Sequence, residues 1–338
     1  MLELAASGVP LESPIEAYFE VANRCNSKCV TCPLTFSPHE DAKQLSLDDF
    51  RGLVDQLPAL QRAVLQGIGE PLLNRDLAAM IRYLKDRGVY VVFNTNAVLL
   101  THRRQVELID SGLDELRVSV DGSTPETYLR VRGIPAFDRV VDNIAETIRT
   151  QRARGVPTPR VSLWVTGMQE NLSELPGVID LAARIGVEEV YLQRMVFGFN
   201  PEALARADES ILDERYRQQA EGFIAESERR AVAQGVRFRG AGALSPRASI
   251  VDRKPMDEPW RECSRPLRLA YVTAQGTALP CCIAPFTEAP YDSITLGNYL
   301  REGVEKVWTG EAYSVFRERL YSSSPPAACK NCGLAWSL

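Results

Sequence analysis

Histidine is almost missing from this chain: only His39 and His102 occur among its 338 residues. Neither lies near a cysteine group or a nucleophile motif. Zinc sites built on imidazole and Ser–His–Asp triads both need histidine at defined positions. The sequence therefore argues against histidine-based metal or hydrolytic chemistry.

The chain also lacks long apolar runs. No segment approaches the roughly 20 residues that a membrane-spanning helix needs. Residues 1–20 have neither the basic flank nor the apolar stretch of a signal peptide. The net charge of −5 gives no basis for nucleic-acid binding. We therefore expect a cytoplasmic protein with no membrane and no nucleic-acid partner.

Cysteine, by contrast, is frequent and unevenly placed, with eight residues in two groups. Disulfides are rare in a reducing compartment, so clustered cysteines there indicate metal or redox chemistry. The first group is Cys25, Cys29 and Cys32, and the second is Cys263, Cys281, Cys282, Cys329 and Cys332.

Residues 15–197 alternate between strand and helix patterns. Helix starts are indicated by the capping-box spacing of Ser46 and Asp49, and by Thr124 followed by Pro125. Six such alternations predict an α/β fold with a parallel sheet, although periodicity does not separate an open sheet from a partial barrel. The predicted strands are Ile15–Ala22, Arg62–Gln66, Val89–Asn94, Glu115–Val120, Arg160–Thr166 and Glu188–Arg194.

The remaining chain differs in character. Residues 203–235 predict a polar helix, and residues 240–258 predict a connector. A hairpin is expected around Gln275 and Gly276. The predicted organisation is an N-terminal extension (1–14), an α/β domain (15–200), a helical linker (201–257) and a small C-terminal α+β domain (258–338). The predicted apolar face of the helix is Leu212, Tyr216, Ala220, Phe223 and Ile224.

The first cysteine group directly follows the first predicted strand, with C-x3-C-x2-C spacing. Three thiolates on one loop can hold three irons of a cubane cluster, which leaves the fourth iron open to bind substrate or cofactor. A zinc loop is the alternative, but no nearby histidine or cysteine supplies a fourth ligand.

This loop resembles the signature of the radical S-adenosylmethionine (SAM) superfamily, and further motifs agree with the resemblance. Gln66-Gly-Ile-Gly-Glu-Pro-Leu72 is similar to the family's GGEP motif, and Ser119-Val-Asp-Gly122 to its SxDG element. The resemblance spans residues 15–197 and implies a partial (β/α)6 TIM barrel with its chemistry at the C-terminal strand ends. The cofactor-binding residues it implies are Gly67, Gly69, Glu70, Pro71, Asn94, Asn96, Ser119, Asp121 and Gln193.

The resemblance also implies the chemistry. Cys25, Cys29 and Cys32 would hold a 4Fe-4S cluster whose open iron binds SAM. Reductive cleavage of SAM would give a 5′-deoxyadenosyl radical that abstracts a hydrogen atom from the substrate. The cluster must first be reduced, so a flavodoxin- or ferredoxin-type partner is expected.

The second group resembles the twitch domain, a shortened SPASM extension. Cys263, Cys281, Cys329 and Cys332 would hold one auxiliary 4Fe-4S cluster, with a four-cysteine zinc ribbon as the alternative. Cys282 has three readings: it exchanges with Cys281 as a ligand, it packs as a small buried side chain, or it donates a hydrogen atom to a substrate radical.

The substrate remains open at this stage. About 14 residues precede the first predicted strand, so we expect a small molecule, as in the aminocyclitol and sugar dehydrogenases and epimerases of antibiotic biosynthesis that the chain resembles. The leading hypothesis is oxidation of a ring alcohol to a ketone, with Arg194 named as one candidate base. The alternatives are an epimerase using Cys282, a maturase of ribosomal peptides, and a non-catalytic electron-transfer protein.

Overall fold

The computed structural model of the protein describes residues 12–36, 38–195, 209, 211, 213–240, 245–247, 259–287, 289–330 and 332. Within them lies one nine-stranded sheet in the order β7-β6-β5-β4-β3-β2-β1-β8-β9. Every neighbouring pair is parallel except β8 and β9. The strands are β1 (Glu16–Phe19), β2 (Arg62–Val64), β3 (Tyr90–Thr95), β4 (Glu115–Ser119), β5 (Arg160–Gly167), β6 (Glu189–Arg194), β7 (Arg237–Gly240), β8 (Leu269–Val272) and β9 (Ala278–Leu279).

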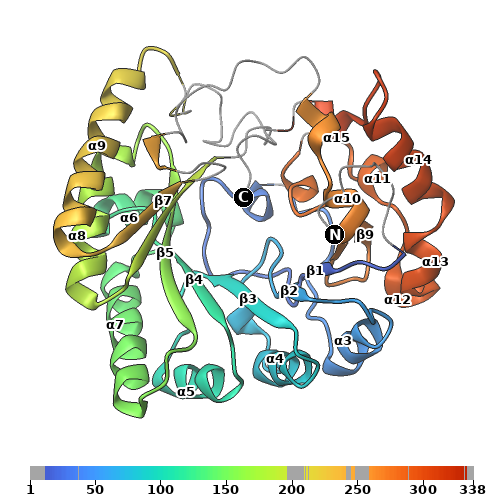
Figure 1. The fold of residues 1–338 in the computed structure, drawn as a ribbon, viewed down its shortest axis with the longest axis horizontal. Helices are drawn as coiled ribbons and strands as arrows, with labels where there is room; N and C mark the ends of the chain where they lie inside the picture. Colours follow the sequence, from blue (N-terminus) through green and yellow to red (C-terminus); the bar gives the residue numbers. More distant parts are fainter. Residues whose placement is uncertain are drawn as a thin grey trace.

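Helices lie along the outer side of this curved sheet. Figure 1 shows α4, α5, α7, α8 and α9 following one another around it, with α12, α13 and α14 beyond β9. The partial (β/α)6 barrel predicted from the sequence is therefore confirmed. The helices are α2 (Pro33–Phe36), α3 (Leu47–Val54), α4 (Leu77–Lys85), α5 (His102–Asp110), α6 (Pro125–Arg132), α7 (Phe137–Arg154), α8 (Leu175–Ile185), α9 (Arg217–Gln234), α10 (Arg265–Arg268), α11 (Tyr291–Ile294), α12 (Tyr299–Glu302), α13 (Val304–Trp308), α14 (Glu311–Leu320) and α15 (Ala327–Lys330).

The predicted helix starts are the observed ones. The Ser46 side chain accepts a hydrogen bond from the Asp49 backbone N–H and caps α3. Thr124 caps α6 in the same way, and Pro125 occupies its first turn. Gly133 ends α6 in the left-handed region at φ 70°, where glycine avoids the Cβ penalty.

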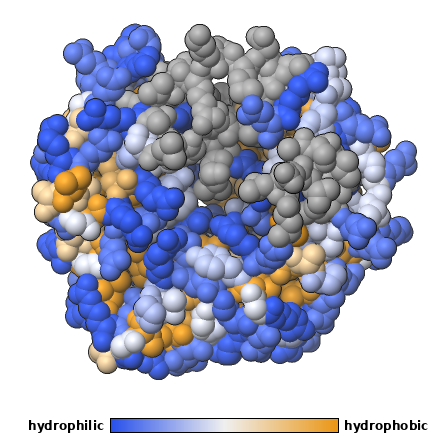
Figure 2. Space-filling view, in the orientation of Figure 1, coloured by the Kyte–Doolittle hydropathy of each residue, from blue (hydrophilic) through white to orange (hydrophobic). Residues whose placement is uncertain are grey.

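The apolar core lies between the sheet and its outer helices. Each helix presents one apolar stripe to the sheet, as Leu77, Met80, Ile81 and Leu84 of α4 illustrate. On the face seen in Figure 2, apolar residues appear only in patches bounded by hydrophilic side chains. Among the described residues, no helix has the length and apolar character needed to cross a bilayer.

The segment predicted as a helical linker contributes to the barrel. Alongside α9 it supplies β7, which pairs in parallel with β6 and was not predicted from the sequence. Ala220 and Ile224 are buried as expected, and Tyr216 and Phe223 pack against the core, while Leu212 lies outside the described residues. The predicted hairpin is confirmed as β8 and β9, but β8 also pairs in parallel with β1. One sheet therefore contains strands from both the predicted α/β domain and the predicted C-terminal domain.

Candidate active site

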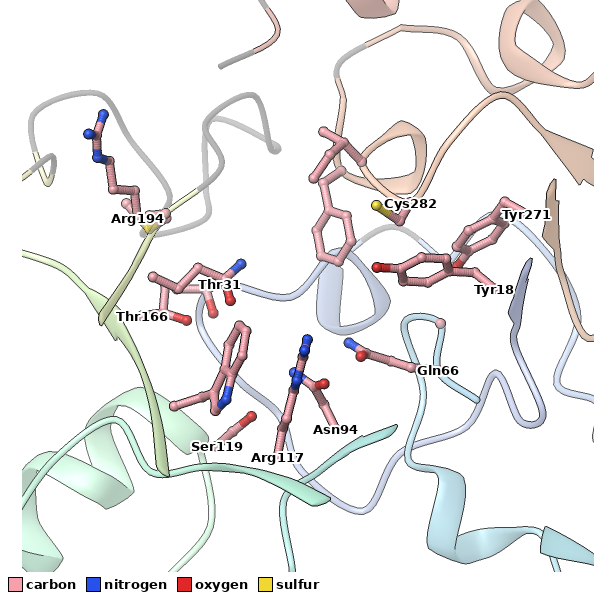
Figure 3. Close-up of a pocket in the computed structure, with 16 residues that line it drawn as sticks. Tyr18, Thr31, Gln66, Asn94, Arg117, Ser119, Thr166, Arg194, Tyr271 and Cys282 are labelled. Carbon is pink, nitrogen blue, oxygen red and sulfur yellow. The ribbon is translucent and has the colours of Figure 1, made fainter. Parts of the chain in front are cut away.

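The main cavity opens at the C-terminal ends of the strands and contains about 940 Å³ of unfilled space, its open mouth included. The strands bring to it side chains that are far apart in the sequence, because parallel strands end at one edge of a barrel. Figure 3 shows Asn94, Arg117 and Ser119 rising from one side, and Tyr18 and Cys282 facing them. Predicted site residues that line the cavity are Gly67, Asn94, Ser119, Gln193, Arg194 and Cys282.

The first cysteine loop lies between β1 and α2 and is fixed by Asn96. The Asn96 amide donates to Asn26 Oδ1 at 2.7 Å, to Ser27 Oγ at 3.1 Å and to Cys25 Sγ at 3.7 Å. The Ser27 backbone N–H also donates to Cys25 Sγ, at 3.4 Å. Asn96 therefore acts on the loop, and it is absent from the cavity lining.

A buried cation lies behind the same loop. Arg132 pairs with Asp121 at 3.0 Å, and the backbone carbonyl of Arg132 accepts from the Lys28 N–H. Burial lowers the pKa of Arg132, but Cys29, Asp121 and Tyr128 together raise it above its ordinary value, so it stays charged. Burial raises the pKa of Cys32 to about 12, while Arg132 lowers the pKa of all three thiols. The N–H donors and this cation fit three thiolates that ligate a cluster.

The GGEP-like segment is built by close backbone approach. A Cβ on Gly69 would lie 2.1 Å from the Ala22 carbonyl oxygen, and one on Gly67 would lie 2.1 Å from Glu20 Oε2. Position 69 therefore requires glycine, and a side chain at position 67 would displace the Glu20 side chain. Pro71 opens a short 3-10 helix, Pro71–Leu73, behind the cavity wall.

The Glu70 side chain holds neighbouring backbone in place through hydrogen bonds. Its buried carboxylate accepts from the Leu72 N–H at 3.0 Å, the Thr95 hydroxyl at 2.7 Å and the Asn96 N–H at 2.8 Å. Its own N–H donates to the Arg24 carbonyl at 2.8 Å. Burial raises its pKa. Gly69, Glu70 and Pro71 are thus not part of the cavity lining but join the cysteine loop to the end of β3.

Asn94 offers an unsatisfied polar atom. Its Oδ1 is buried and has no hydrogen-bond partner among the described residues, although the side chain lines the cavity. Such an atom is costly unless a ligand or water reaches it, so the site fits a polar cofactor. Asp121, by contrast, is absent from the lining: it accepts from Arg132 and from the Thr166 N–H at 2.7 Å.

A second cavity lies under the C-terminal segment. Cys263, Cys281, Cys329 and Cys332 all line it, whereas Cys282 does not. Burial raises the pKa of Cys332 to about 12, while the nearby Arg265 lowers it, as Arg265 also does for Cys263 and Cys281. Four thiols around one space beside a cation fit a fully ligated cluster. Among the described residues, no group of three or more His, Cys, Asp or Glu side chains lies close enough together to hold a single metal ion.

Cys282 lines the main cavity instead. Burial raises the pKa of this thiol to about 11, and a hydrogen bond with the Tyr18 side chain lowers it. The Tyr18 ring stacks on Tyr271 at a centroid distance of 6.1 Å. Arg194 also lines this cavity, but its guanidinium points away from the other labelled side chains (Figure 3).

Sequence reasoning missed several charged or aromatic residues of the site: Tyr18, Glu20, Arg117, Arg132 and Trp164. None belongs to a motif. The available signal was weak: Tyr18 and Arg117 interrupt apolar strands at alternate positions, which indicates a barrel interior that is polar.

Two family models match the chain. The radical SAM superfamily matches residues 19–182, and the SPASM iron–sulfur cluster-binding domain matches residues 263–333. The radical SAM domain binds SAM and a 4Fe-4S cluster, and the SPASM domain binds auxiliary iron–sulfur clusters. The zinc-ribbon alternative for the second cysteine group is therefore wrong.

Curated relatives align along almost the whole chain at low identity. An AdoMet-dependent heme synthase of Methanosarcina barkeri is 26% identical, over 89% of this chain and 83% of its own length. The mycofactocin maturase MftC of Mycobacterium tuberculosis is 26% identical, over 96% and 76%. The PqqA peptide cyclase of Ruegeria pomeroyi is 26% identical, over 97% and 82%.

Solved structures share the fold. Streptococcus suis SuiB bound to S-adenosylmethionine has a TM-score of 0.70 at 15% identity, covering 99% of this chain and 74% of SuiB. SuiB has also been solved bound to its precursor peptide SuiA, with a TM-score of 0.68 at 13% identity, covering 97% of this chain and 78% of SuiB.

Proposed function

We propose that this chain, which matches the radical SAM superfamily and the SPASM domain, is a radical SAM enzyme that modifies a peptide by abstracting a hydrogen atom from one of its C–H bonds. The observation that carries the proposal is the pair of relatives named as a peptide maturase and a peptide cyclase, which align over 96% and 97% of this chain. They favour the peptide-modifying alternative over oxidation of a sugar or aminocyclitol alcohol.

We assign the cluster ligands from the two cysteine groups. Cys25, Cys29 and Cys32 hold the SAM-binding cluster, while the four cysteines around the second cavity hold the auxiliary one. When bound, SAM and its cluster supply the 5′-deoxyadenosyl radical that takes the hydrogen atom. A flavodoxin- or ferredoxin-type protein delivers the electron.

The chain's own residues position the reactants. Asn94 Oδ1 would accept a hydrogen bond from the cofactor, and Ser119 at the end of β4 and Gln193 at the end of β6 would contact it. Asn96 and Arg132 keep the cysteine loop in place through hydrogen bonds with Ser27 and Lys28. The open mouth of the main cavity admits a peptide segment, which then lies between these strand ends and Cys282.

A second candidate is inversion of a stereocentre, favoured by the position of Cys282 in the main cavity. A substrate carbon radical would take a hydrogen atom from the Cys282 S–H, forming a C–H bond and leaving a thiyl. One electron from the reductant protein and one proton would restore the thiol. Tyr18, which lines the same cavity and lowers the pKa of this thiol, would orient it.

The test uses anaerobically reconstituted, reduced protein with SAM. Short peptides encoded beside the gene are compared with a panel of amino sugars and aminocyclitols. We expect 5′-deoxyadenosine and a mass or chirality change only with a peptide. Turnover of a sugar alone overturns the peptide proposal, and the absence of 5′-deoxyadenosine with every probe overturns the catalytic assignment.

A further inference from the structure

A chamber rich in arginine lies below the main cavity, inside the N-terminal half of the barrel. Three side chains, Tyr18, Arg117 and Trp164, line both spaces. The lower chamber is lined by six arginines against only three glutamates, Glu16, Glu115 and Glu189. The arginines are Arg62, Arg117, Arg160, Arg239, Arg265 and Arg268.

Arg117 is held rigidly at the boundary. Its Nε donates to Glu115 Oε1 at 2.8 Å, and its guanidinium carbon lies 4.3 Å from the centre of the Trp164 ring. Trp164 in turn stacks on Tyr191 at 4.1 Å and donates from Nε1 to Ser162 Oγ at 3.0 Å. Figure 3 shows the Arg117 guanidinium pointing up into the main cavity beside Asn94. The side chain is therefore oriented before any ligand binds.

The carboxylates nearby do not neutralise this cluster. Glu115 is shared between Arg117 and Arg160, at 2.8 and 3.1 Å. The Arg62 side chain makes no hydrogen bond or ion pair with the part of the chain that the structure describes. Burial raises the pKa of Tyr18, while the charges of Arg62, Arg117 and Arg265 lower it, which places three cations around this phenol. Arg117 and Arg62 thus bring positive charge to the boundary between the two spaces.

We propose that Arg117, supported by Arg62, binds a carboxylate of the peptide substrate at the floor of the main cavity. This inference rests on the proposed function and narrows it to peptides with an acidic side chain, or a free C-terminus, close to the modified residue. The Nε atom of Arg117 is taken by Glu115, but the two Nη atoms can pair with a carboxylate in bidentate fashion, and desolvation by the barrel strengthens that bond.

The experiment measures binding, not turnover, in SAM-loaded holoenzyme by saturation-transfer NMR and calorimetry. The probes are acetyl-Ala-Glu-amide against acetyl-Ala-Gln-amide, and acetyl-Ala-Ala with a free C-terminus against its amide. We expect one acidic probe to bind about tenfold more tightly than its amide partner. The first pair tests the acidic side chain, and the second tests the C-terminal carboxylate.

The R117Q variant is expected to lose this preference, R117K to keep part of it, and R103Q, altered at an exposed arginine of α5, to keep all of it. Equal binding of acid and amide probes by the wild type overturns the proposal. So does a preference that survives in R117Q, or loss of SAM binding in R117Q, since Arg117 would then serve the cofactor. A carboxylate preference without peptide turnover sinks the proposed function alone.

Discussion

Cys281 and Cys282 are adjacent in the chain, yet Cys281 lines the C-terminal cavity and Cys282 lines the main cavity. The turn after β9 thus gives the auxiliary site and the reaction space one thiol each. Of the readings that the sequence leaves open for Cys282, this position disfavours exchange with Cys281 as a ligand.

Substitution of the two thiols separates their roles. We expect C281S to lose the auxiliary cluster, so that iron falls from about eight to about four per chain, while C282S keeps its iron. Iron analysis and electron paramagnetic resonance of the reduced protein measure this. Equal iron loss in both variants would show that both thiols serve the same cluster.

The asparagines at the end of β3 form a matched pair. N96A removes the amide that bonds Asn26, Ser27 and Cys25, so we expect a stability loss of about 1–3 kcal/mol and poor loading of the first cluster. N94A removes an oxygen that has no partner among the described residues, so stability and iron should hold while SAM affinity falls. Chemical denaturation, iron analysis and equilibrium dialysis provide the readouts. If N96A and N94A changed stability, iron content and SAM affinity alike, the separate roles given to Asn96 and Asn94 would be wrong.

Gly69 is expected to tolerate no side chain. The Cβ of G69A would meet the backbone carbonyls of Ala22 and Arg24 at 2.1 and 2.7 Å, so the cysteine loop must shift, at a cost of about 1–3 kcal/mol and of cluster loading. The control is G222A in α9, where the added Cβ meets nothing within 4 Å. Its helical propensity should raise stability by about 0.5–1 kcal/mol. A G69A protein as stable as wild type would refute the packing argument.

Glu20 is expected to make stability depend on pH. Burial raises the pKa of its carboxyl from 4.5 to about 7, and Glu40 adds to the rise. A raised pKa means that the folded protein binds the proton more tightly than the unfolded chain. This contribution is therefore complete below about pH 4.5 and lost as the pH rises through about 7, at most about 3 kcal/mol.

The E20Q variant isolates this effect. Glutamine cannot ionise, so the fall in unfolding free energy between pH 5.5 and 8 should be smaller in E20Q than in wild type. The difference in slope is the measure, because glutamine also loses one of the two backbone bonds from Ile68 and Ala274. If the unfolding free energy depended on pH equally in E20Q and in wild type, Glu20 would not be the group responsible.

The predicted and observed structures agree where local chemistry is decisive. The caps of α3 and α6 and the first six strands were found because side-chain bonding and apolar runs are local signals. β7, with the sequence Arg-Phe-Arg-Gly, was missed because it is an edge strand of mostly exposed side chains. Its strand conformation depends on pairing with β6.

The site shows the same division. The two cysteine groups were recognisable because a cluster dictates ligand type and spacing. Motif matching names Glu70 and Asp121 as cofactor-binding residues, which stays a prediction; only the structure showed that their carboxylates bond the Asn96 N–H and Arg132. The small-molecule substrate inferred from the short N-terminal segment is disfavoured by the peptide-modifying relatives.

The sequence alone determined that three thiols follow the first strand, that more thiols lie near the C-terminus, and that alternating strands and helices join them, because each depends on residue type and short-range order. Only the tertiary structure decided which cavity each thiol faces, which cation lies behind each cysteine group, and that arginines line the barrel's interior. Those outcomes depend on the direction in which each side chain leaves its strand or turn, and on neighbours up to 250 residues away, which no local pattern encodes.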